Sequence, residues 1–176
     1  MTRACRRFAR YRPLLGTLDP RETLCQTSLV TTSWGESPRS SITRYAHEVG
    51  EDVLVGRLVE LLGGDPLDDE LGVALAGPAS RLVLAGREGG PTGYWARVWA
   101  LRGLHYVWRD VATDPVIASC ADPSWRCREM ALKVAARHRL DEALEVAARR
   151  QRDEVVRVRL AAQRVLRVLT ADGSAP

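Results

Sequence analysis

Basic side chains recur at a fixed spacing in the second half of the chain, where they could contact phosphate groups. Arg102, Lys133 and Arg164 stand 31 residues apart, and Arg126 and Arg157 are separated by the same interval. If each interval forms the same structural unit, these side chains line up along one face. Such a basic stripe is typical of contacts with a nucleic-acid backbone. An ordinary solvated helix face is the alternative interpretation.

A second row of arginines, Arg97, Arg128 and Arg159, has the same period, and so do three alanines, at 100, 131 and 162. A period of about 20–50 residues indicates stacked structural repeats. Proteins of this kind usually present surfaces to other molecules rather than enclose a catalytic centre. The row is therefore either a second phosphate-binding stripe or a set of structural contacts between repeats.

The residue types needed for catalysis are present without a recognisable motif. The three histidines are scattered, and the four cysteines contain no CxxC pair, which disfavours a zinc site and a disulfide scaffold. The acidic run 68–70 is better explained by a helix N-terminus than by a metal. The glycine-rich segment 86–93 lacks the Lys-Ser/Thr of a P-loop. We therefore expect no metal or other cofactor and favour a non-enzymatic protein.

The charge is unevenly distributed. The chain has 26 basic and 22 acidic residues and a net charge of +4, but residues 51–90 carry −5 and residues 91–176 carry +5. All basic residues except Lys133 are arginines, whose planar donor fork suits phosphates and carboxylates; a GC-rich genome would give the same excess. No apolar run approaches the roughly 18–20 residues of a membrane span. We expect a cytoplasmic protein without a membrane partner.

Hydrophobic periodicity places the predicted elements. Residues 1–44 have no sustained period and predict a flexible or disordered tail, followed by a helical domain over 45–170 and a disordered C-terminus over 171–176. Helices are expected near 51–62, 65–76, 79–85, 94–107, 114–121, 124–137, 141–150 and 154–170. Aromatic residues gather near the start of the fourth of these helices and just after its end, where they either fill a core or bind a partner.

Residues 122–128, Asp-Pro-Ser-Trp-Arg-Cys-Arg, followed by Ala131 and Val134, resemble a HEAT repeat. More narrowly, they resemble the short HEAT-like repeats of bacterial phycobilin-lyase-type and scaffold proteins. The resemblance covers about 94–170, and residues 153–159 repeat its Asp-to-Arg spacing. It implies an all-α solenoid, an α-α superhelix of about three to four repeats. It also implies an Asp–Arg ladder between neighbouring repeats, formed by Asp122, Arg128, Asp153 and Arg159. The Arg97 repeat departs from the pattern because Pro91 occupies its Asp position.

This interpretation favours an adaptor or scaffold that binds another protein, still unknown. We expect the contacts on the concave face of the shorter second helices and at exposed aromatic rings, namely Trp95, Trp108, Ile117, Asp141, Glu145 and Arg149. The unpaired last helix predicts a further surface, for a homodimer or a protein partner. Two alternatives stay open. One is nucleic-acid binding through the basic stripe, as in some HEAT-like DNA glycosylases, and the other is an accessory subunit of a lyase-type enzyme.

Overall fold

The computed structural model describes residues 36–86 and 93–171, all within the compact unit Thr32–Pro176. Every regular element in these two ranges is helical, with nine α-helices and one short 3₁₀ helix. The prediction of an all-α fold is confirmed for this part of the chain. No helix in it is long and apolar enough to cross a bilayer. Most of the predicted N-terminal tail, most of the glycine-rich segment and residues 172–176 lie outside the described ranges.

The first helix, α1 (Pro38–Val49), begins inside the segment predicted to be a tail, so that prediction is wrong for residues 38–44. Its start has a capping signal, because the Ser37 side chain accepts the Ser40 N–H and Pro38 occupies the first turn. Ile42 and Tyr45, one turn apart, are buried. The buried Ser41 hydroxyl donates to the Ala74 carbonyl at 2.9 Å and thereby ties α1 to the third helix.

Three further helices complete the N-terminal part: α2 (Glu51–Gly63), α3 (Asp69–Ala76) and α4 (Ser80–Leu84). Gly64 ends α2 with φ at 108°, a left-handed conformation that glycine adopts without steric cost. Asp68 caps α3 by accepting the Leu71 N–H at 2.9 Å, and it also pairs with Arg57. The acidic run 68–70 thus stands at a helix N-terminus, with Asp68 as the cap.

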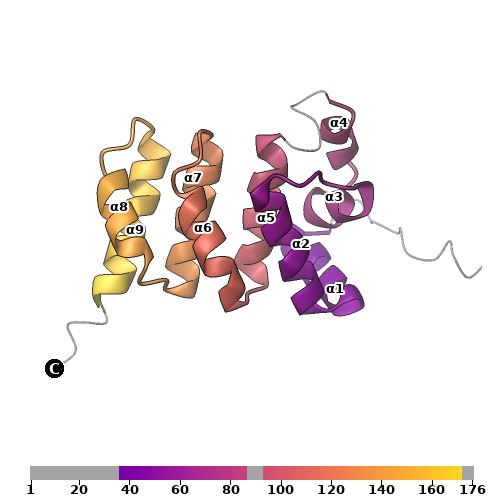
Figure 1. Cartoon of the computed structure of the whole chain (residues 1–176), viewed down its shortest axis with the longest axis horizontal. Helices are drawn as coiled ribbons and strands as arrows, with labels where there is room; N and C mark the ends of the chain where they lie inside the picture. The colour runs from indigo at the N-terminus through magenta and orange to yellow at the C-terminus, as the bar shows by residue number, and fades with distance from the viewer. Residues whose placement is uncertain (1–35, 87–92, 172–176) are drawn as a thin grey trace, which may run out of the picture. The chain divides into compact units, whose positions relative to one another are not determined.

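The C-terminal part consists of longer and shorter helices in alternation (Figure 1). They are α5 (Tyr94–Tyr106), α6 (Thr113–Ser119), α7 (Trp125–His138), α8 (Ala143–Arg150) and α9 (Val156–Ala171), with the 3₁₀ helix Asp110–Ala112 before α6. The predicted helices over this stretch are confirmed. The long helices pack in succession, α5 on α7 and α7 on α9, while α6 packs on α7 and α8 on α9.

Positions related by 31 residues have the same environment where these long helices meet. Ala100, Ala131 and Ala162 are each fully buried, and their small side chains let neighbouring helix backbones approach closely. The equivalence ends on α9. Leu101 and Leu132 are fully buried, but Gln163, at the same position of α9, is exposed. At this position α9 is therefore polar where α5 and α7 carry a core leucine, while Val156 and Leu160 of α9 are exposed apolar side chains.

Gly103 marks the junction between the N-terminal helices and the repeated part. A Cβ at this position would lie 2.7 Å from Leu58 Cδ1 and 3.2 Å from Leu75 Cδ2. The equivalent positions on α7 and α9 carry the buried valines Val134 and Val165. α5 therefore approaches α2 and α3 more closely than the repeat pattern alone would permit.

Candidate functional site

Two arginines of the repeated row form bidentate ion pairs with an aspartate 25 residues further along the chain. Arg97 donates to Asp122 at 2.7 and 3.3 Å, and Arg128 donates to Asp153 at 2.9 and 3.0 Å. Each aspartate also accepts a backbone N–H two residues later, from Ser124 at 2.7 Å or from residue 155 at 3.0 Å. Each pair therefore joins one long helix to the turn that starts the next long helix.

The same row also secures the turns before α7 and α9. Arg128 Nη1 donates to the carbonyls of Asp122 and Pro123, and Arg159 Nη1 donates to those of Asp153 and Glu154. Burial raises the pKa of Asp153, but hydrogen bonds from Arg128 and a backbone N–H outweigh it, so the net pKa is below the usual value. Arg128 is buried in these contacts and is not presented to a phosphate.

Two details of the ladder differ from the sequence-based expectation. Arg97 takes part despite Pro91, because its aspartate comes from the turn that follows, not from the one that precedes it. Arg159 bonds only to backbone carbonyls, and no described acidic side chain forms an ion pair with it. No described helix follows α9 to supply the next aspartate.

The other basic row lines a groove of about 810 Å³ along α5, α7 and α9. Four of the five predicted stripe residues lie there: Arg102 of α5, Lys133 of α7, and Arg157 and Arg164 of α9. The groove adds two cations that the period did not single out, Arg137 and Arg139. Apolar and neutral side chains fill the spaces between them: His105, Tyr106, Met130, Ala136, Leu160, Ala161 and Val168.

Glu129 is the one acidic side chain in the lining of this groove, among the described residues. It is 9% exposed and accepts hydrogen bonds from Lys133 Nζ at 2.7 Å and Arg157 Nε at 3.3 Å. It therefore connects the cations of α7 and α9. Three other groove cations, Arg102, Arg137 and Arg164, form no ion pair with a described acidic side chain, and the groove keeps a strong positive excess.

The groove also contains His105, whose pKa is lowered by its surroundings. Its Nδ1 is buried without a hydrogen-bond partner among the described residues. Burial lowers the pKa of His105, and the positive charges of Arg137, Arg164 and Lys133 and the neighbouring His138 lower it further, to about 4. The imidazole is therefore neutral at physiological pH, since a further positive charge is disfavoured in this groove.

Arg126, the fifth predicted stripe residue, lies on an aromatic cluster instead of lining the groove. Its guanidinium carbon is 4.5 Å from the Trp125 ring centroid, 5.5 Å from that of Trp95 and 5.6 Å from that of Tyr94. Arg157 also lies over Trp125, at 5.6 Å. These cation–π contacts hold both guanidinium groups beside the rings at the N-terminal ends of the long helices.

None of the six residues predicted to bind a protein partner lines this groove or the smaller groove between α2 and α6. Trp95 stacks on Trp99 with ring centroids 6.0 Å apart, and Trp108 stacks on His138 at 4.3 Å. Glu145 and Arg149 form an ion pair with each other on α8. Ile117 is half-buried on α6, and Asp141 is exposed before α8.

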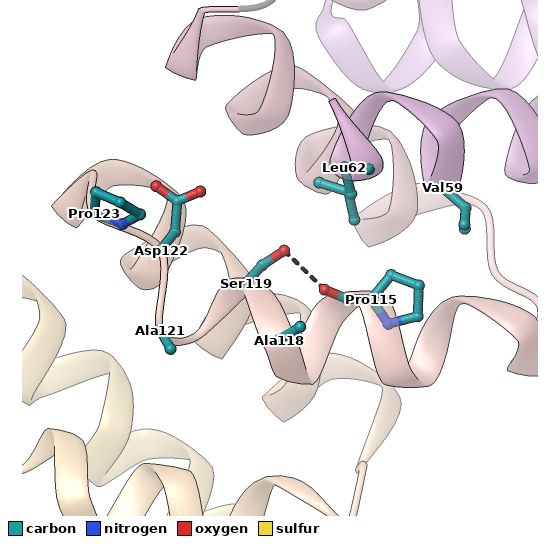
Figure 2. A pocket seen from close by; sticks show the side chains of 9 residues that line it. Val59, Leu62, Pro115, Ala118, Ser119, Ala121, Asp122 and Pro123 are labelled. Atoms are coloured by element: carbon teal, nitrogen blue, oxygen red, sulfur yellow. Dashed lines mark hydrogen bonds between the residues drawn. The ribbon is translucent and has the colours of Figure 1, made fainter. Parts of the chain in front are cut away.

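A second groove, of about 520 Å³, lies between α2 and α6 (Figure 2). Val59 and Leu62 of α2 face Pro115 and Ala118 of α6 across it. Its polar groups are already engaged: the Ser119 hydroxyl donates to the Pro115 carbonyl at 2.8 Å, and the carboxylate at 122 belongs to the ladder. The groove is therefore mainly an apolar surface without a converging set of reactive groups.

The described residues also include two cysteines and several side chains of metal-binding type. They contain no group of three or more His, Cys, Asp or Glu side chains arranged to hold a metal ion. Cys120 and Cys127 are buried, and burial raises their pKa values to about 12 and about 11. Both thiols are therefore protonated, and so weakly nucleophilic, at neutral pH.

No protein-family model, curated protein or solved structure matches the chain. The groove along α5, α7 and α9 is therefore the strongest indication of function.

Proposed function

We propose that this protein is a small HEAT-like solenoid that binds nucleic acid, without catalysis, through the groove of α5, α7 and α9. The observation that carries the proposal is the charge of that groove, which is lined by one carboxylate and six basic side chains, five on α5, α7 and α9 and one, Arg139, just after α7. Basic residues that neutralise phosphates release condensed counterions, and this release supplies most of the affinity for a nucleic-acid backbone.

The groove cations are available at low cost. Arg102, Arg137 and Arg164 break no ion pair with a described residue when they bind a phosphate. Lys133 and Arg157 share one carboxylate, that of Glu129, so together they keep a net positive charge. About five phosphate contacts are therefore within reach of the groove without disrupting the ladder that joins the helices.

The distribution of the cations favours an extended polyanion over a single small anion. Neighbouring packed helices lie about 8–10 Å apart, so three successive helices spread their cations over roughly 16–20 Å. A single phosphate contacts only a small part of such a surface. A nucleic-acid backbone, with many phosphates in a row, contacts all three helices together.

The adaptor hypothesis and the homodimer through α9 remain predictions.

Charge reversal within the groove tests the proposal. The triple variant Arg102→Glu, Lys133→Glu, Arg164→Glu removes one cation from each long helix. We expect its salt slope for binding mixed-sequence DNA to fall by about three units, because each lost phosphate contact removes about one unit. Fluorescence anisotropy over a salt series measures both affinity and slope.

Arg152→Glu is the matched control. Arg152 is exposed and does not line the groove, so its reversal changes the net charge without touching the proposed site. The proposal fails if the wild-type protein does not bind, or if this control weakens binding as much per charge as the groove variant does. Circular dichroism checks that each variant keeps its helices.

A further inference from the structure

Proteins that hold single strands combine a basic groove with aromatic rings on which successive bases stack. Three aromatic rings at the N-terminal ends of α5 and α7, those of Tyr94, Trp95 and Trp125, already contact the protein's own guanidinium groups. Trp125 carries two guanidinium groups, from Arg126 and Arg157. Tyr94 and Trp95 lie 5.2 Å apart, and Arg126 lies over both. A guanidinium group of the protein thus already lies over each of these half-buried rings, in a position that a stacked base would need.

The groove lining itself contains a single phenol or indole ring among its described residues, that of Tyr106. The His105 imidazole meets it edge-on, with centroids 5.2 Å apart and planes at 82°. One ring of this kind does not form a row of stacking platforms. The groove thus supplies charge without the aromatic series that a single strand needs.

The electrostatic contribution alone favours a duplex. For a given number of contacts, affinity falls with salt more steeply for B-DNA than for a single strand, with slopes of about −0.9 and −0.7 per contact. With about five contacts the slopes differ by about one unit, which at about 0.1 M salt corresponds to about tenfold tighter binding of the duplex.

Base stacking is large enough to reverse that preference where it occurs. A single stacked base contributes about 5- to 150-fold in affinity. Whether bases can stack on these rings therefore decides between a duplex and a single strand, and guanidinium groups of the protein already lie over the rings. We infer that the groove of α5, α7 and α9 takes double-stranded nucleic acid in preference to single strands, an inference that rests on the proposed function.

The test compares a DNA duplex of about 20 base pairs with each of its separated strands, using the full chain at about 0.1 M salt. We expect the duplex to bind about tenfold more tightly and with the steeper salt slope. Tyr106→Leu should leave the affinity ratio unchanged, because stacking on this ring is not required. The triple charge-reversal variant shows whether the groove mediates binding to each ligand.

The outcomes of this test distinguish nucleic-acid binding by the groove from the preference for a duplex. Equal or tighter binding of the single strands, lost on charge reversal, overturns the duplex preference but leaves nucleic-acid binding by the groove intact. A loss of single-strand affinity in Tyr106→Leu, together with a single-strand preference, identifies stacking as the reason. Absence of binding to both ligands, or binding that charge reversal does not change, overturns the proposed function and the inference with it.

Discussion

Arg128 and Asp153 form a bidentate ion pair whose side chains are only 7% and 2% exposed. The equivalent pair, Arg97 with Asp122, has the same sequence separation and pairing but is more open, at 24% and 9%. The two pairs differ mainly in burial. They therefore permit a comparison of buried and half-buried ion pairs within one protein.

Asp153→Ala is expected to lower the free energy of unfolding by about 3–5 kcal/mol, since it leaves a buried guanidinium without its carboxylate. Asp122→Ala should cost less, because Arg97 can reach water. Glu154→Ala is the control: Glu154 contacts Arg128 at 3.4 Å but is 82% exposed, so its loss should cost about 0–1 kcal/mol. Denaturant unfolding measures all three. A cost for Asp153→Ala no larger than that for Glu154→Ala contradicts this account.

Gly103→Ala is expected to destabilise the protein by about 1–2 kcal/mol, although alanine is the better helix former. The added Cβ meets Leu58, which is fully buried and has little room to move. Gly56→Ala on α2 is the matched control, because a Cβ there has no heavy atom within 4 Å. It should stabilise by up to about 1 kcal/mol. Thermal unfolding measures the change in stability of each variant. A change of the same sign for both variants would contradict the packing explanation.

Glu129→Gln is expected to raise affinity for duplex DNA by about tenfold at about 0.1 M salt, because it releases Lys133 and Arg157 and steepens the salt slope by about one unit. The amide keeps the shape of the side chain. Glu145→Gln on α8 removes the same charge outside the groove and should change affinity little. If both substitutions raise affinity equally, net charge alone is responsible and Glu129 has no special position.

His105 provides a local measure of ligand binding. Its pKa, about 4 in the free protein, should rise when phosphates bind, because they offset the positive charges of Arg137, Arg164 and Lys133. The rise should be partial, since burial continues to lower the pKa. Proton uptake on binding also means that affinity increases as the pH falls toward the pKa of the bound state. NMR titration of the imidazole with and without duplex measures the shift, with exposed His47 as a reference signal. An unchanged pKa at saturation would place the duplex elsewhere.

Much of the helical organisation was predictable because the 31-residue period fixes equivalent positions. Ala100, Ala131 and Ala162 mark the helix contacts, and the stripe residues of α5, α7 and α9 converge as their spacing indicates. Arg137 was missed, although it follows Lys133 by one helical turn and so shares its face. The position of Arg126 was not predictable from period alone, because the three rings around it come from two helices.

The start of the first helix was missed for a different reason. The Ser- and Thr-rich composition before residue 44 suggested a tail, while the local signals, Ser37 before Pro38 and apolar Ile42 and Tyr45, indicate a capped amphipathic helix. Helix α1 is stabilised by burial against α3 rather than by the helix propensity of its own residues. Short helices of this kind are decided by tertiary contacts that composition does not report.

Gln163 has a consequence for how the molecule meets copies of itself. Repeat arrays that end on an apolar helix can add copies end to end and grow into filaments. A second molecule that packed a leucine-bearing helix on α9, as α7 packs on it from the other side, would bury the Gln163 amide without a partner. That arrangement would cost about 1–3 kcal/mol, so the Gln163 side chain disfavours this particular end-to-end packing.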